Sequence, residues 1–293
     1  MGRLVSIDGV ITSPENASVS VYDRGFLYGD AVFEVLRTYG GVPFALDQHI
    51  DRLCRSADRV RMKLPVDAAT MAGETRDALT AAGVGEWYAR IMITRGTGPL
   101  GLDIDLASCP LRVTLVEPVK PPPREAYANG IHVVSVATDR ATDGTAAAGA
   151  KVTSYLANML ALHDAKRRGG AEALIVDGQG HVLEGASSNV FIVRGDRLVT
   201  PPESAGILAG ITRAHILAAA ASMGLVTELT ALRLDELAVA DEVFITSSIR
   251  EVVPCVQVDG RRIASGTPGP RTRALHAAFR KAAGAVGNMP WEP

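Results

Sequence analysis

The sequence has few cysteines, no excess of basic charge and no long apolar run, and each of these absences excludes a class of protein. Its three cysteines, Cys54, Cys109 and Cys255, are too far apart for a disulfide framework or a metal knuckle. A net charge of −2 over 293 residues provides no basic field for nucleic acid. No apolar run approaches the roughly 20 residues that span a bilayer. We therefore expect a cytoplasmic protein that binds neither nucleic acid nor a membrane.

Turn and helix signals alternate along the chain and predict an α+β fold. Asp-Gly pairs favour the tight turns of antiparallel hairpins, and three of them lie inside alternating apolar segments, at 4–11, 173–183 and 255–263. Helical periodicity is present at about 47–62, 67–82, 154–168, 211–223 and 270–284. Strands and helices are intermixed, but mostly not as strand–helix–strand units. We therefore expect mixed or antiparallel sheets with helices.

A proline-rich stretch, Glu-Pro-Val-Lys-Pro-Pro-Pro-Arg-Glu at 117–125, predicts a boundary between two domains. Proline removes backbone donors and stiffens the chain, so this stretch belongs to neither core. We expect an N-terminal α+β domain at 1–118, a linker at 119–124 and a C-terminal α+β domain at 125–293.

Lys151 and Glu184 stand in settings that favour cofactor chemistry. An irregular stretch at 138–150 leads directly into Lys151, as expected of a loop that positions a reactive residue. A lysine amine can hold an aldehyde cofactor as a Schiff base, and a carboxylate can hold the protonated pyridine nitrogen of that cofactor. Tyr155 would lie beside Lys151 if a helix begins there. Together they suggest an enzyme that handles amino groups through pyridoxal phosphate, although each alone is more often a surface or core residue.

Three further segments could bind an anion. The turn 206–213 runs into a helix, whose free N–H groups would form an anion cradle with Thr212 in the first turn. Ser247 and Ser248 follow a strand at 242–245, where a plain polar turn is the simpler alternative. Arg52 shares a predicted helix face with His49 and Leu53 and has the donor fork that suits phosphate. The six histidines show no ligand spacing, so we predict no metal site.

Period-two alternation places arginines beside aromatic side chains on two predicted strands. Phe33, Val35 and Arg37 share one face of a strand that begins near residue 31. On the strand 87–94, Tyr88, Arg90 and Met92 share a face. An arginine in such a setting could receive a substrate carboxylate, or it could form a buried structural ion pair.

Taken in order, these segments make the chain resemble the class IV aminotransferases, the fold-type IV pyridoxal-phosphate enzymes. This family includes branched-chain and D-amino acid aminotransferases and aminodeoxychorismate lyase. The resemblance covers about residues 4–265. It depends on the order and spacing of several motifs: Asp-Arg-Gly-Phe-Leu-Tyr-Gly-Asp (23–30) with Phe33-Glu34, His-Ile-Asp-Arg-Leu (49–53), Lys151 with Tyr155, Glu-Gly-Ala-Ser-Ser-Asn-Val-Phe (184–191), Gly-Ile-Thr-Arg (210–213) and Thr-Ser-Ser-Ile-Arg-Glu-Val (246–252).

The resemblance implies a role for each matching residue. Lys151 is expected to be the Schiff-base lysine and proton shuttle, Glu184 the partner of the pyridine nitrogen, and Tyr155 the partner of the ring oxygen. The expected phosphate-binding set is Arg52, Ile211, Thr212 and Ser248, with Ser247 also among the cofactor-binding residues. The expected substrate pocket contains Tyr28, Phe33, Arg37, Tyr88 and Arg90. The family fold implies two α+β domains with the site at their interface, usually in a homodimer.

The resemblance leaves the substrate open. An aminotransferase for L-aliphatic or branched-chain amino acids and a 2-oxo acid is the favoured interpretation, although Val35 stands where branched-chain enzymes often have glycine. Leu100 and Leu102 replace the arginine and histidine of the D-amino acid enzymes, which disfavours that activity. Aminodeoxychorismate lyase remains the second candidate, although Glu34-Val35 replaces a threonine-bearing segment of the enteric-type enzyme. A non-catalytic binding protein with this fold is a third.

Overall fold

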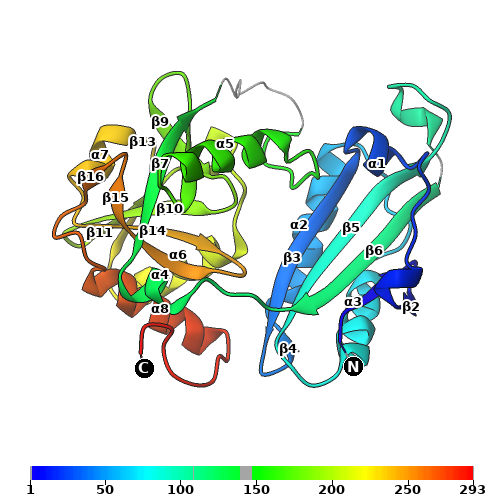
Figure 1. Cartoon of the computed structure of the whole chain (residues 1–293), viewed down its shortest axis with the longest axis horizontal. Coiled ribbons are helices and arrows are strands. Elements are labelled where there is room, and N and C mark those ends of the chain that lie inside the picture. Colours follow the sequence, from blue (N-terminus) through cyan, green and yellow to red (C-terminus); the bar gives the residue numbers. More distant parts are fainter. Residues whose placement is uncertain (1, 108, 139–146, 293) are drawn as a thin grey trace. The chain divides into compact units, whose positions relative to one another are not determined.

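Two sheets, one in each of two units, organise the chain (Figure 1). The computed structural model describes residues 2–107, 109–138 and 147–292. One unit consists of Met1–Lys120 with Ala150–Tyr155, and the second of Pro121–Gly149 with Leu156–Pro293. Helices and mixed or antiparallel sheets occur together, so the predicted α+β class is confirmed. No helix within the described ranges has both the length and the apolarity needed to cross a membrane.

The first unit contains a six-stranded antiparallel sheet with the strand order β2-β1-β6-β5-β3-β4. Its strands are β1 (Leu4–Ile7), β2 (Val10–Thr12), β3 (Ala31–Tyr39), β4 (Val42–Pro43), β5 (Trp87–Thr97) and β6 (Cys109–Pro118). Its helices are α1 (Arg24–Tyr28), α2 (Leu46–Arg59) and α3 (Ala68–Ala82). The Asp8-Gly9 turn joins β1 to β2, as predicted.

Alternation along β3 separates a core face from a second face. Val32 and Leu36 are fully buried in the core beneath α2 and α3, which pack against the sheet. Phe33, Val35 and Arg37 point the other way, as period two requires. The apolar stripe of α2, which includes Ile50 and Leu53, follows helical spacing and completes this core.

The second unit contains a ten-stranded mixed sheet with β16 paired to β15 at its side. The strand order is β12-β11-β10-β14-β15-β7-β8-β9-β13. The strands are β7 (Ile131–Ala137), β8 (Glu172–Val176), β9 (His181–Gly185), β10 (Asn189–Arg194), β11 (Arg197–Thr200), β12 (Val226–Leu229), β13 (Leu232–Arg233), β14 (Glu242–Ser247), β15 (Glu251–Val258) and β16 (Arg261–Arg262). The predicted hairpins at 173–183 and 255–263 are present as β8–β9 and β15–β16.

The helices of the second unit are α4 (Arg124–Ala128), α5 (Leu156–Arg167), α6 (Ile211–Ser222), α7 (Leu234–Ala238) and α8 (Pro270–Ala282). The five longer helices of the two units fall where the periodicity predicted them, with α5 beginning two residues later than expected. The three single-turn helices, α1, α4 and α7, are too short to generate a periodic signal.

Ala150–Tyr155 packs with the first unit, whereas the expected division placed it within a domain at 125–293. The reason is backbone pairing with β3. The Phe33 N–H donates to the Lys151 carbonyl over 2.9 Å, and the Thr153 N–H donates to the Ala31 carbonyl over 3.0 Å. Residues 139–146, which include the Asp143-Gly144 pair of the irregular stretch expected before Lys151, lie outside the described ranges.

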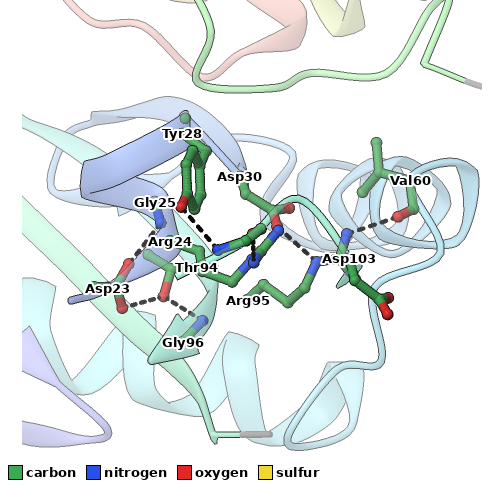
Figure 2. A network of polar contacts seen from close by, with 12 residues as sticks. Asp23, Arg24, Gly25, Tyr28, Asp30, Val60, Thr94, Arg95, Gly96 and Asp103 are labelled. Atoms are coloured by element: carbon green, nitrogen blue, oxygen red, sulfur yellow. Dashed lines mark hydrogen bonds and ion pairs between the residues drawn. The ribbon is translucent and has the colours of Figure 1, made fainter. Parts of the chain in front are cut away.

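A half-buried carboxylate, Asp30, joins the ends of several elements in the first unit (Figure 2). It accepts from the Arg24 Nε over 2.9 Å and from the Arg95 Nε over 2.8 Å. Arg95 also donates to the carbonyl of Val60, just beyond α2, and Arg24 donates to the carbonyl of Gly101. Burial raises the pKa of Asp30, but the two guanidinium groups outweigh burial and lower it overall. The start of β3 is thereby fixed to α1, α2 and the loop after β5.

Two glycines of the first unit provide a matched test of backbone constraint. Gly96 lies at an irregularity of the β5–β6 pairing with φ +91°, and a Cβ there would lie 1.8 Å from the Cys109 carbonyl oxygen. Gly73 lies within α3 with open space around it. We expect Gly96→Ala to reduce the free energy of unfolding by about 2 kcal/mol or more. Gly73→Ala should increase it by about 0.5–1 kcal/mol. Urea unfolding of both variants checks this, and equal effects would contradict it.

Candidate active site

Lys151 is held to the first unit through both its backbone and its amine. Its N–H donates to the Ser56 Oγ of α2 over 3.1 Å, and its carbonyl accepts from the Phe33 N–H. The amine Nζ donates to the Tyr155 hydroxyl over 3.3 Å. Lys151 and Tyr155 are therefore adjacent, as predicted. The predicted reason is wrong, because α5 begins only at Leu156 and the two residues meet through a non-helical bend.

Two cations and a phenol surround the Phe33 ring. The Lys151 Nζ lies 4.5 Å from the ring centroid, and the Arg90 guanidinium carbon lies 4.0 Å from it. Tyr155 meets the same ring edge-on, with 5.3 Å between centroids. Phe33 is only 3% exposed, so these cation–π contacts form in a partly desolvated setting, where each can contribute up to about 2 kcal/mol.

Four of the five predicted substrate residues share the second face of the sheet. Cross-strand register places Arg37 opposite Tyr88 and Arg90 opposite Val35. Burial raises the pKa of Tyr88, although Arg90 opposes that effect. Tyr28, the fifth residue, ends α1, and its hydroxyl accepts from the Gly101 N–H over 3.2 Å. It therefore belongs to the network around the loop after β5 (Figure 2).

Arg52 is a buried helix residue paired with a buried carboxylate. Its Nε and Nη2 donate to the two carboxylate oxygens of Glu34 over 2.6 and 2.7 Å. His49 Nδ1 contacts Glu34 at 2.8 Å. Glu34 is fully buried, and the exposures of His49 and Arg52 are 1% and 5%. This bidentate pair fixes the plane of the Arg52 guanidinium. Alternation along β3 puts Glu34 on the face opposite to Phe33 and Arg37, but no local pattern in the sequence indicates that its partner is Arg52.

The charges of Glu34, His49 and Arg52 determine the protonation of the Glu34 carboxyl group and the His49 ring. Burial by itself raises the pKa of Glu34, but the Arg52 guanidinium and the His49 ring outweigh burial and lower it from 4.5 to about 2. Burial also lowers the pKa of His49, although the Glu34 carboxylate opposes this. His49 is therefore neutral at pH 7. Because an ionised carboxylate can only accept, the His49 Nδ1 carries the hydrogen.

The second unit presents Glu184 beside the start of α6. Glu184 lies near the end of β9, and its carboxylate accepts from the Leu208 N–H over 3.1 Å. Asn189, the first residue of β10, donates from Nδ2 to the Leu208 carbonyl over 2.9 Å. A Cβ at Gly210 would lie 1.9 Å from the Asn189 Oδ1, so a larger residue at this position would displace the Asn189 side chain. The two strand ends thus fix the segment that leads into α6.

The first turn of α6 is suited to an anion. Gly210 is the N-cap and has no side chain to satisfy the N–H groups of Ile211, Thr212 and Arg213. Thr212 is 3% exposed and lies in the first turn of α6, two residues after the N-cap, so its side chain does not cap the helix. On β14, which packs against α6, the Thr246 hydroxyl is buried without a hydrogen-bond partner in the described part of the chain. Both features fit an anionic group of a ligand.

Ser247 and Ser248 lie at a turn that connects β14 to β15. Ser247 is the last residue of β14 and pairs with Glu251, the first residue of β15. The predicted strand end at residue 245 was therefore two residues short. The Ser247 Oγ accepts from the backbone N–H of Arg250 over 3.3 Å and from its Nε over 3.2 Å. The serine hydroxyl keeps its own proton available for a ligand.

Glu251, the first residue after the turn 248–250, has a left-handed backbone, with φ +58°, a conformation that favours glycine. Its carboxylate accepts from His276 Nε2 over 2.6 Å and from the Arg280 guanidinium over 3.0 Å, both on α8. Glu251 is 1% exposed. These bonds hold the turn in its strained form from one side. In the sequence, Glu251 is visible only as part of the motif at 246–252.

The groups that each unit supplies are of the chemical types that suit pyridoxal phosphate. The first unit supplies an amine beside a phenol and a buried guanidinium, through Lys151, Tyr155 and Arg52. The second unit supplies a carboxylate, an open helix N-terminus and serine hydroxyls, through Glu184, Ile211, Thr212, Ser247 and Ser248.

Comparison with known proteins decides the family. The class IV amino-transferase family model matches residues 31–258. The chain belongs to the class IV aminotransferases. It is 36% identical over 276 residues to a Methanocaldococcus jannaschii protein provisionally named a branched-chain-amino-acid aminotransferase, covering 94% of this chain and 95% of that one. It is 32% identical to the D-alanine aminotransferase of Bacillus licheniformis, with the same coverage.

Solved structures agree with this assignment. The Escherichia coli branched-chain amino acid aminotransferase superposes with a TM-score of 0.91 and 28% identity, covering 96% of this chain and 94% of that one. A branched-chain amino acid aminotransferase from a second organism, abbreviated T.th. and solved with pyridoxamine 5'-phosphate, gives a TM-score of 0.90 and 28% identity, over 97% and 94%. This class IV aminotransferase is therefore a transaminase of fold type IV that uses pyridoxal phosphate.

The Glu34–Arg52 pair predicts how stability depends on pH. Glu34→Gln leaves a buried guanidinium without its counter-charge and should cost about 3–5 kcal/mol at pH 7. Because the folded-state pKa of Glu34 is lowered, its contribution is complete above pH 4.5 and is lost as the pH falls toward 2. The difference between variant and wild type should therefore shrink below pH 4.5. Urea unfolding from pH 7 to pH 3 measures it.

Asp47→Asn provides the control, because the Asp47–Arg76 pair is exposed, with its two side chains 81% and 53% accessible. That substitution should cost less than about 1 kcal/mol. A Glu34→Gln variant no less stable than Asp47→Asn would contradict the assignment of a strong buried pair.

Proposed function

We propose that this class IV aminotransferase transfers the amino group of an L-aliphatic or branched-chain amino acid to a 2-oxo acid in a ping-pong reaction. The observation that carries this substrate class is the second face of the first sheet. It combines the apolar side chains Phe33, Val35 and Met92 with the arginines Arg37 and Arg90. The relatives named as branched-chain aminotransferases support the same substrate class.

Each residue has a defined part in this proposal. Bound pyridoxal phosphate supplies an aldehyde carbon and a ring that withdraws electrons from the substrate Cα. The Lys151 amine holds the cofactor and moves the proton at the substrate Cα. The Tyr155 hydroxyl, within reach of that amine, would bind the ring oxygen of the cofactor. The Glu184 carboxylate holds the proton on the pyridine nitrogen.

Two further groups bind the charged ends of the ligands. The phosphate is held by Arg52, Ile211, Thr212 and the Ser247–Ser248 turn, through side chains and free N–H groups. Arg90 receives the side-chain carboxylate of the acceptor acid. Donor and acceptor would use the same site in turn. The donor would therefore leave as a 2-oxo acid, with its amino group retained on the cofactor, before the acceptor binds and takes that group.

D-amino acid transfer is the second candidate, because D-alanine aminotransferases are among the relatives. Leu100 and Leu102 argue against it. They are 67% and 83% exposed and carry no charge with which to hold a carboxylate. A donor screen with both enantiomers of each amino acid decides the matter by following loss of the visible absorbance of the bound cofactor. Pyruvate release from aminodeoxychorismate, without an acceptor acid, would instead identify the lyase.

Lys151→Ala provides the test of the amine. The variant should lose the visible absorbance of enzyme-bound pyridoxal phosphate and lose turnover with every donor. Lys166→Ala, which removes a lysine from α5 without affecting the proposed site, should retain both. Spectra and single-turnover assays of the two variants measure this. Turnover by Lys151→Ala at the wild-type rate would refute the role of Lys151.

We also propose a homodimer in the cytoplasm. The cytoplasmic placement is supported by three free cysteines.

The dimer is supported by an exposed apolar cluster on the first unit, in which Val21, Tyr22 and Phe26 are 64%, 58% and 72% accessible. Hydrogen bonds from the Gly101 N–H to Tyr28 and from Arg24 to the Gly101 carbonyl connect this cluster to the loop that carries Leu100 and Leu102. Apolar area of this kind favours association with a second copy.

Phe26→Asp tests the dimer. A charge placed among these exposed apolar side chains should convert the protein to monomers in light scattering coupled to size exclusion, because an unpaired charge opposes burial. Val84→Asp is the matched control, since Val84 is fully exposed outside the cluster and should leave the mass unchanged. A dimer that persists in Phe26→Asp at micromolar concentration would contradict this assignment of the interface.

A further inference from the structure

Arg250 connects three separate segments of the second unit. Its Nη1 donates to the Glu172 Oε2 over 2.5 Å, and its Nη2 donates to the carbonyl and the hydroxyl of Ser187, each over 2.9 Å. Its Nε donates to the Ser247 Oγ. All three nitrogens of the guanidinium are thus engaged, each by a different segment of the chain. The residue cannot serve as a free receptor for a substrate carboxylate.

Glu172 makes this connection rigid. It is the first residue of β8 and is fully buried. Its carboxylate also accepts from the Ser188 hydroxyl over 3.2 Å and from the Ala173 N–H over 3.0 Å. A buried carboxylate with fixed donors leaves the arginine little freedom to move, because each of its bonds would have to break in a low-dielectric setting.

The segments that Arg250 joins carry proposed ligand groups. Ser187 follows Glu184 by three residues, in a turn closed by the Gly185 N–H bond to the Ser188 carbonyl over 2.6 Å. A Cβ on Gly185 would lie 2.0 Å from the Ser188 Oγ, so the turn is tightly packed. Ser247 begins the turn that presents Ser248. The Arg250 carbonyl itself accepts from the Tyr127 hydroxyl over 3.1 Å, which fixes the backbone as well as the side chain.

We propose that Arg250 is a positioning residue: with Glu172 as its counter-ion, it sets the Ser247–Ser248 turn against the turn that follows Glu184, so that both present their ligand groups in one fixed arrangement. This inference rests on the proposed roles of Glu184 and Ser248. Displacement of a ligand group by about 1 Å can cost roughly a hundred-fold in rate, so the connection matters although Arg250 touches neither cofactor nor substrate.

The Arg250→Lys substitution tests whether Arg250 positions the two turns or only neutralises the charge of Glu172. In Arg250→Lys the ammonium can still neutralise Glu172, but a single nitrogen cannot also reach Ser187 and Ser247 in the geometry of the fork. We expect a thermal midpoint close to wild type. The pyridoxal phosphate concentration needed for half-saturation and the KM for the amino donor should both rise roughly ten-fold or more.

Arg250→Ala provides a second test through chemical rescue. The Arg250 side chain is 22% exposed, so a free guanidinium ion can enter the space it leaves. Millimolar guanidinium chloride should restore cofactor affinity toward the wild-type value, whereas sodium chloride at equal concentration should not. Arg168→Ala is the control: Arg168 lies in the same unit and pairs with Asp259 at 53% exposure. This control should keep wild-type cofactor affinity and KM.

The outcomes separate this inference from the proposed function. Wild-type cofactor affinity and KM in Arg250→Lys and Arg250→Ala, with or without a lower thermal midpoint, would overturn the positioning role. A wild-type enzyme that transfers no amino group from aliphatic donors would overturn the proposed function. The positioning role would then still be supported if the cofactor half-saturation shifts in Arg250→Lys and is rescued by guanidinium in Arg250→Ala.

Discussion

The pairing of residues 151–153 with β3 is the constraint on which the candidate site depends. Two backbone hydrogen bonds, from Phe33 to Lys151 and from Thr153 to Ala31, add a segment to the first sheet. This segment lies more than a hundred residues later in the sequence than β3. Ser56 fixes the same segment to α2. Arg52 lies one helical turn before Ser56, on the same face of that helix. The amine and the guanidinium assigned to the cofactor are thereby held by one rigid body.

Three carboxylates paired with arginine, two of them buried and one half-buried, each fix a different place in the described part of the chain. Glu34 orients Arg52, Glu172 holds Arg250, and Asp30 holds the loop after β5 through Arg24 and Arg95. Such pairs contribute little net stability, because desolvation of the charges offsets their attraction. Their effect is on geometry: the bidentate fork fixes direction as well as distance. The protein therefore obtains fixed loops from interactions that would be a poor means of stabilising a core.

The hydrophobic periodicity and the turn residues of the sequence predicted the helices and strands. Which residues of different elements contact one another depends on long-range pairing, which these local patterns do not report. Alternation along β3 placed Phe33 and Arg37 on one face and Glu34 on the other, and the register with β5 agrees. The same reasoning could not find Arg52 as the partner of Glu34, because the two lie on different elements brought together only by packing. Nor could it place Lys151 in the first unit, since the strand extension joins residues more than a hundred positions apart. Arg250 was visible in its motif, yet nothing local indicates Glu172.

The second face of the first sheet suits the proposed exchange between two unlike substrates. A branched-chain donor presents an apolar side chain, whereas a dicarboxylic acceptor presents a second charge. In this proposal Phe33 would supply apolar area for the first, and Arg90, stacked on that same ring, would supply charge for the second. The ring also lies beneath the Lys151 amine. Because the aromatic quadrupole attracts both cations, the guanidinium remains close to the amine when no carboxylate is present, without needing a buried acid as its partner. A permanent counter-ion would compete with the acceptor; an aromatic ring does not.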